Sequence, residues 1–105
     1  MKQSLEFVGV GGTDYETVGA SATDQVLGGA GALNDLIARL VVTVNTSATS
    51  TLSIKDGAGA SIPLVAANAP IGTFDIEIGA RSKAGAWSVT TGAGVTVVAV
   101  GQFSI

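Results

Sequence analysis

The chain has 105 residues, which is enough for one domain with one hydrophobic core. Hydrophobic residues make up 47% of the chain, which argues against disorder, and only 12% of the residues are charged, about half of the share in an ordinary soluble domain. The net charge of −3 argues against nucleic acid as the main partner, and the absence of Cys and His excludes disulfides and metal sites made of those residues.

The low charge also bears on association and location. A soluble monomer normally carries more surface charge, so we expect this chain to cover uncharged surface against neighbouring subunits; a neutral Gly/Ala/Thr-rich monomer is the alternative. The N-terminus lacks the apolar stretch of a signal peptide, and no apolar run approaches membrane-spanning length. We therefore expect synthesis in the cytoplasm and no membrane partner.

The first third of the chain contains short strand candidates separated by glycine-rich breaks. Residues 5–10 are a candidate first strand, which the glycines at 11 and 12 interrupt. Residues 17–20 and 24–27 are weaker candidates, and residues 28–32 predict a flexible loop. Residues 33–36 are ambiguous, because Asn or Asp could cap a single helical turn there.

From Leu36 onward the sequence alternates clearly. Residues 36–45 predict a long strand, because every second residue is apolar and the β-branched run 41–44 disfavours a helix. One face of this strand is predicted to carry Leu36, Ala38, Leu40, Val42 and Val44, and the other Ile37, Arg39, Val41, Thr43 and Asn45. Residues 46–50 predict a turn, and residues 51–55 a strand with Leu52 and Ile54 inward.

Two more strands follow in the middle of the chain. Residues 61–65 predict a strand that Pro63 confines to a sheet edge or makes irregular, because proline cannot donate to the ladder. Residues 73–78 form the cleanest amphipathic strand: Phe74, Ile76 and Ile78 point inward and Asp75 and Glu77 outward. Residues 79–85 predict a polar loop.

Residues 86–105 predict the two strands around which the chain is organised. Gly92-Ala93-Gly94 joins them, so we expect a hairpin that belongs to the core. Val95, Val97, Ala99 and Phe103 share one face, and Val98 and Val100 share the other. Apolar residues on both faces predict a central strand that further protein covers on each side. In total, seven to nine short strands predict a sandwich or barrel in a single domain, residues 1–105.

The sequence offers weak candidates for ligand sites. The three Gly-Ala-Gly stretches, at 29–31, 57–59 and 92–94, lack the Lys-Ser/Thr pair of a phosphate loop, and we interpret them as turns. Asp14, Glu16 and Asp24 could bind a hard cation such as calcium, but their order does not match the calcium-loop signature, which favours a solvated acidic surface. Asp56 is interpreted as a turn residue.

Catalytic candidates are weaker still. Asp75 and Glu77 could be a carboxylate pair for glycoside hydrolysis, but such a pair must flank a substrate, whereas same-face neighbours on an amphipathic strand are typical of its solvated side. Nucleophilic catalysis lacks a His base. We predict no enzyme activity, no catalytic residue, no metal and no cofactor. Trp87 and Tyr15 could form an aromatic platform for a sugar, but the alternation of Trp87 with Val89 favours a core position.

A resemblance to a known family is carried by residues 83–97 and 101–104, together with Ser53–Gly57 and Leu40–Val44. These stretches resemble small structural proteins of tailed-bacteriophage virions, most of all capsid decoration, or cement, proteins. The resemblance implies a non-enzymatic homotrimer that binds the major capsid protein on the outside of the virion and holds capsid subunits together. Residues 1–15 lie outside it and would be either a capsid-docking arm or an ordinary first strand.

We therefore expect an antiparallel β-sandwich of jelly-roll type that acts by binding on a phage capsid. The alternative is a carbohydrate- or receptor-binding β-sandwich module on a phage tail or fibre. An exposed row of aromatic residues would favour the alternative, whereas oligomerisation through small-residue faces favours the decoration protein.

Overall fold

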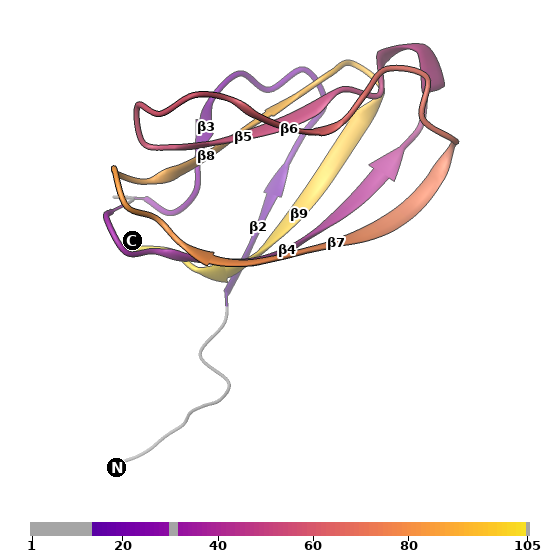
Figure 1. Ribbon diagram of the computed structural model, residues 1–105. Coiled ribbons are helices and arrows are strands. Elements are labelled where there is room, and N and C mark those ends of the chain that lie inside the picture. Colours follow the sequence, from indigo (N-terminus) through magenta and orange to yellow (C-terminus); the bar gives the residue numbers. More distant parts are fainter. Residues whose placement is uncertain (1–13, 30–31, 105) are drawn as a thin grey trace.

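The computed structural model describes residues 14–29 and 32–104, which form two packed antiparallel sheets (Figure 1). The strands are β2 (Asp14–Val18), β3 (Gln25–Val26), β4 (Leu36–Val44), β5 (Leu52–Asp56), β6 (Ile62–Val65), β7 (Gly72–Arg81), β8 (Trp87–Thr91) and β9 (Val95–Gln102). A single 3-10 turn, η1 (Ser47–Thr49), lies between β4 and β5. In these two ranges no helix is long and apolar enough to cross a bilayer. The candidate strand at residues 5–10 lies outside them.

The strand pairing is nested. One sheet has the order β2-β9-β4-β7 and the other β3-β8-β5-β6. Among the described strands, the first pairs with the last, the second with the last but one, and so on inward to β5 and β6. The chain changes sheet at every connection except the one between β5 and β6. This is the strand order of a long hairpin rolled into two sheets, which is the eight-stranded jelly roll. The predicted fold is confirmed.

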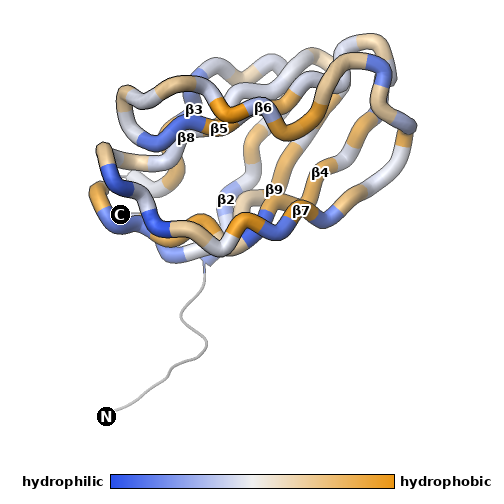
Figure 2. Tube along the Cα trace, viewed as in Figure 1, coloured by the Kyte–Doolittle hydropathy of each residue, from blue (hydrophilic) through white to orange (hydrophobic). Residues whose placement is uncertain are grey.

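The hydrophobic core lies between the two sheets. Its side chains follow the period of two along the strands, and hydrophobic residues run along β4 and β9 (Figure 2). The buried apolar residues are Val18, Leu27, Ile37, Leu40, Val42, Val44, Leu52, Ile54, Trp87, Val89, Val95, Val97, Ala99 and Phe103. Trp87 is only 4% exposed, and its indole Nε1 donates a hydrogen bond to the carbonyl of Asp35 at 3.0 Å, which confirms its core position.

The hairpin expected at residues 86–105 is wrong, because β8 and β9 belong to different sheets. The turn 92–94 instead carries the chain across the core and packs against the β4–β5 connection. A Cβ atom on Gly92 would lie 2.4 Å from the carbonyl oxygen of Thr49, and one on Gly94 would lie 2.2 Å from that of Thr46. These glycines therefore permit close backbone approach. The turn 57–59 does join two paired strands, β5 and β6, as expected.

The faces predicted for β4 are wrong at its beginning. The register of β4 against both β7 and β9 shifts between Ile37 and Arg39, which is a β-bulge. The additional residue, Ala38, allows Ile37 and Leu40 both to face the core, so Ile37 is buried and Leu36 is only half-buried. Beyond the bulge, Val42 and Val44 are buried as expected.

Most other elements lie close to their expected positions, but β7 continues to Arg81, so the polar loop expected at residues 79–85 is wrong for residues 79–81. Asp14 and Tyr15 belong to β2, residues 33–34 form a turn and not a helix, and Leu36 begins β4. β6, with Pro63, is an edge strand, and β7 is one of the two edge strands of the other described sheet. The residues of β7 alternate between half-buried and exposed as predicted, with Asp75 and Glu77 exposed.

β9 is a central strand as expected, between β2 and β4. Its inward residues are buried, whereas the outward Val98 and Val100 are half-buried. The expected covering on both faces is not found in the described part of the chain, because no described element packs over the outer side of β9.

Candidate docking surface

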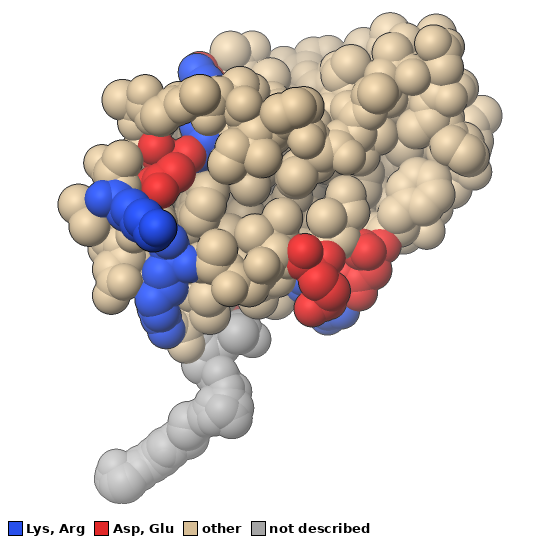
Figure 3. All heavy atoms as spheres, in the orientation of Figure 1, with Lys and Arg blue, Asp and Glu red and all other residues tan. Residues whose placement is uncertain are grey.

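Four connections meet at one end of the sandwich, and the only charged residue in them is Asp24, the last residue of the β2–β3 connection. Their uncharged parts are residues 19–23, 45–51, 66–71 and 92–94, and we call the surface that these parts form the uncharged end. The nearest charge along the chain is Asp24, which directly precedes β3 and lies 3.5 Å from Lys55 Nζ. In Figure 3 the charged side chains form separate groups near β7 and at the opposite end, and the rest of the visible surface is uncharged.

Serine side chains join two of these connections. The hydroxyl of Ser47 donates to the carbonyl of Ala69 at 2.7 Å, and the hydroxyl of Ser50 donates to the carbonyl of Ala66 at 2.7 Å. The backbone N–H of Asn68 donates to the carbonyl of Ser47 at 2.8 Å. Residues 45–51 and 66–71 are therefore fixed to each other.

The 92–94 turn is bonded to residues 19–23 on one side and to residues 45–51 on the other. The hydroxyl of Thr91, the last residue of β8, donates to the carbonyl of Gly19 at 2.7 Å. The backbone N–H of Ser21 donates to the carbonyl of Gly92 at 3.1 Å, and the N–H of Gly94 donates to the carbonyl of Thr49 at 3.1 Å. All four connections thus belong to one hydrogen-bonded unit.

The composition of the uncharged end suits contact with a protein surface. It consists of Gly, Ala, Ser, Thr and Asn, with Pro70 and the largely exposed Ile71. Burying such a surface removes no ion from water, which is the costliest part of desolvation. Short side chains lose little rotamer entropy on burial, and connections that are already fixed lose little backbone entropy.

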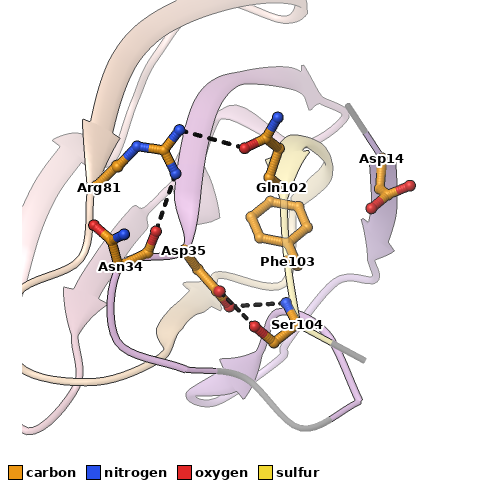
Figure 4. Close-up of a pocket in the computed structure, with 7 residues that line it drawn as sticks. All are labelled: Asp14, Asn34, Asp35, Arg81, Gln102, Phe103 and Ser104. Atoms are coloured by element: carbon orange, nitrogen blue, oxygen red, sulfur yellow. Dashed lines mark hydrogen bonds between the residues drawn. The ribbon is translucent and has the colours of Figure 1, made fainter. Parts of the chain in front are cut away.

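A shallow polar pocket of about 270 Å³ lies at the opposite end (Figure 4). It is lined by Asp14, Asn34, Asp35, Arg81, Gln102, Phe103 and Ser104. The guanidinium of Arg81 donates to the carbonyl of Asn34 at 3.1 Å and to Oε1 of Gln102 at 3.4 Å. Arg81 is therefore hydrogen-bonded to other residues of the chain, and the pocket is lined by both acidic and basic side chains.

Asp35 lies in this pocket and is only 7% exposed. Its carboxylate accepts hydrogen bonds from the backbone N–H and the hydroxyl of Ser104, at 3.0 and 2.7 Å, and from the N–H of Ala32 at 3.1 Å. Burial, the largest single influence, raises the pKa of Asp35, but these hydrogen bonds together outweigh it and hold the pKa below its ordinary value. Asp35 therefore anchors Ser104, and its carboxylate oxygens are occupied by hydrogen bonds within the chain.

The acidic residues considered for a cation site do not converge. The carboxylate of Glu16 accepts from Gln25 Nε2 and from the N–H of Gly28, both at 2.8 Å, so it joins β2 to β3 and the following loop. Asp24 lies beside Lys55, and Asp14 lines the polar pocket. Within residues 14–29 and 32–104 no group of three or more acidic side chains could hold a metal ion.

Asp56 has a wider role than a turn residue. Its carboxylate accepts hydrogen bonds from the backbone N–H groups of Ala84, at 3.0 Å, and Lys83, at 2.8 Å. These bonds, that from Ala84 first, hold the pKa of Asp56 below its ordinary value. Asp56 therefore fixes the β7–β8 connection to the end of β5.

The residues considered for catalysis and sugar binding share no common site. Tyr15 lines a pocket of about 290 Å³ together with Asp14, Glu16, Gly28, Gly29 and Phe103. Asp75 and Glu77 are exposed on the outer side of β7, where Asp75 Oδ2 lies 3.0 Å from Nη1 of Arg39. Trp87 is buried, whereas Tyr15 is 73% exposed on β2, so the two rings form no common platform.

Comparison with known proteins gave no match to this chain among protein-family models, curated proteins or solved structures.

Proposed function

We propose that this protein is a capsid decoration protein of a tailed bacteriophage, which binds the major capsid protein on the outside of the virion as a homo-oligomer, with a trimer favoured. It acts by binding and not by chemistry. The uncharged end is the observation that carries the proposal, because it offers a rigid surface suited to docking on another protein without ion pairs. The resemblance of residues 83–97 to virion structural proteins supports it from the sequence.

The fold is compatible with this role but does not select it. Jelly rolls occur in viral capsid proteins and in lectins, and function depends on the site and not on the fold. The alternative, a carbohydrate- or receptor-binding module of a tail or fibre, has less support from the described residues. Tyr15 is the one largely exposed aromatic ring among them, whereas Trp87 and Phe103 are buried and Phe74 is half-buried.

A protein that binds only the assembled shell stabilises that shell by mass action. Because the docking surface is uncharged, binding should persist at high salt, where exposed ion pairs are screened. The test compares purified heads with and without the protein, under heat or chelator, at low and at high salt. We expect heads that carry the protein to rupture later at both salt concentrations. Equal rupture with and without it would contradict the decoration role.

Two alanines at opposite ends of the sandwich give a matched pair of variants. Ala93 and Ala58 are each the exposed central residue of a Gly-Ala-Gly turn, but only Ala93 belongs to the uncharged end. Ala93→Asp should weaken binding to heads, since it buries an unpaired charge, whereas Ala58→Asp should bind as the wild type does. If both variants bind heads equally well, the uncharged end is not part of the docking surface. Binding to a glycan array without protection of heads would favour the tail or fibre module.

A further inference from the structure

The outer edge of β2 is open among the described residues. β2 pairs with β9 on one side and with no described strand on the other. Natural proteins normally pair or cover the backbone N–H and C=O groups of such an edge. One of these groups is already used, because the carbonyl of Thr17 accepts a hydrogen bond from Nε2 of Gln25, in the other sheet, at 3.2 Å. Since alternate residues of a strand direct their backbone groups to the same side, those of Tyr15 also face the open edge.

The pocket of about 290 Å³ beside Tyr15 follows this edge. Three consecutive residues of β2 line it, Asp14, Tyr15 and Glu16, and Phe103 and two glycines line the remainder. Consecutive side chains of a strand point to opposite faces of the sheet, so a pocket that touches all three runs along the edge and not over one face. A further strand beside β2 would lie there, about 4.8 Å away.

The sequence directly before β2 has the pattern of a strand followed by a tight turn. Residues 5–10 are the candidate first strand, and Gly11-Gly12 follows them. Gly-Gly is one of the preferred sequences of two-residue hairpin turns, in which the central residues adopt positive φ. A turn of this kind at Gly11-Gly12 places Val8 directly opposite Tyr15 as a hydrogen-bonded pair. The backbone of Tyr15, which faces the open edge, is oriented for this register.

We infer that the occupant of the β2 edge is the N-terminal segment of the same chain, with residues 7–10 paired antiparallel to residues 13–16. The pairing ends at Glu16, because the carbonyl of Thr17 is bonded to Gln25. A segment that is joined to β2 by two residues has a far higher effective concentration at this edge than any separate chain.

The register gives both central side chains of this segment an apolar neighbour. Val8 packs beside the ring of Tyr15, which is 73% exposed without it. Phe7 is opposite Glu16 and therefore on the inner side of the sheet, where it fills the pocket beside Phe103. The segment thus closes the core at the β2 edge.

Residues 7–10 consequently extend the sandwich and do not form a capsid-docking arm. The pairing does not depend on the proposed function, because the surface proposed to dock on phage heads is the uncharged end, which begins at residue 19, beyond the other end of β2. Protection of heads and pairing of this strand can therefore fail separately.

Engineered cysteine pairs test the pairing in the full chain, which has no cysteine of its own. Opposite residues of antiparallel strands have Cα atoms about 4.5–5.5 Å apart, within the range of a disulfide. Val8→Cys combined with Tyr15→Cys should therefore form an intramolecular disulfide under mild oxidation. Gly9→Cys combined with Tyr15→Cys is the matched control. Its loop is one residue shorter, but the two side chains lie on opposite faces, so it should oxidise at least about tenfold more slowly.

Amide hydrogen exchange is a second measurement. The N–H of Tyr15 should exchange at least about tenfold faster in Val8→Pro than in the wild type, because proline cannot take part in the ladder. The N–H of Val42, in the central strand β4, should exchange equally in both and so reports that the sandwich is folded. Equal oxidation of the two cysteine pairs, a disulfide that joins two molecules, or an unchanged exchange rate of Tyr15 in Val8→Pro would each overturn the inference.

Discussion

Replacing Trp87 by alanine should destabilise the fold strongly. Trp87 is nearly fully buried, and truncation of a buried aromatic residue to alanine costs about 3–5 kcal/mol. About 1 kcal/mol of this should come from the lost hydrogen bond to the carbonyl of Asp35. That carbonyl keeps a second donor, the N–H of Ser82 at 2.9 Å, so it is not left unsatisfied. Trp87→Phe, which keeps most of the apolar volume, should therefore cost only about 1–2 kcal/mol.

The assay is urea unfolding followed by far-ultraviolet circular dichroism, because Trp87 is the only tryptophan and its fluorescence disappears in the variants. Asp75→Ala and Glu77→Ala are the controls, and each should change the free energy of unfolding by less than about 0.5 kcal/mol. Both side chains are exposed, and the ion pair of Asp75 with Arg39 lies at the surface, where such pairs contribute little. If Trp87→Ala costs less than about 1 kcal/mol with an unchanged denaturant slope, the core is not built around this side chain.

Two further results are expected from the same measurements. Gly94→Ala should lower the free energy of unfolding by at least about 1–3 kcal/mol, since its Cβ would lie 2.2 Å from the backbone carbonyl oxygen of Thr46. Gly19→Ala is the control and should be nearly neutral, because no atom lies within 4 Å of its Cβ. Equal unfolding midpoints of the two variants would contradict the close packing of the β8–β9 turn. The lowered pKa values of Asp35 and Asp56 stabilise the fold above the ordinary carboxyl pKa of about 3.9, and this contribution is lost as pH falls through the lower folded values. The melting temperature should therefore fall steeply below about pH 4, and less steeply in Asp35→Asn; an identical acid profile for that variant would show that Asp35 contributes nothing.

The elements that the sequence predicted well are those whose signal is local. The alternation of Phe74, Asp75, Ile76 and Glu77 predicts β7 and both of its faces, because it depends only on the period of a strand. The restriction of Pro63 to an edge is equally local, since it follows from the missing N–H of one residue.

What the sequence could not predict depends on distant partners. The turns 57–59 and 92–94 have the same Gly-Ala-Gly chemistry, yet one closes a hairpin and the other crosses between sheets, because the pairing of β8 and β9 with other strands decides the path. The bulge at Ala38 is set by the packing of β4 between two neighbours. Asp35 was missed because its main partner, Ser104, is 69 residues away.

The candidate docking surface could be anticipated only in part. The low total charge was visible in the composition, and it led to the prediction of uncharged contacts. That the uncharged segments 19–23, 45–51, 66–71 and 92–94 gather at one end is a product of the jelly-roll strand order, which brings alternate connections together.

The nested strand order also has a consequence for how the chain acquires its structure. β9 is synthesised after every other described strand, yet it occupies the middle of its sheet, between β2 and β4. Until it inserts, those two strands have no common neighbour, and the inner valines of β4 have no complete core to enter. Pairing of strands this far apart in sequence is slow, since a long loop must close before any contact is gained. Folding of this sandwich should therefore be completed only after β9 has been synthesised, on a timescale of about milliseconds to seconds. A nascent chain that still lacks β9 should expose apolar strand edges that favour aggregation.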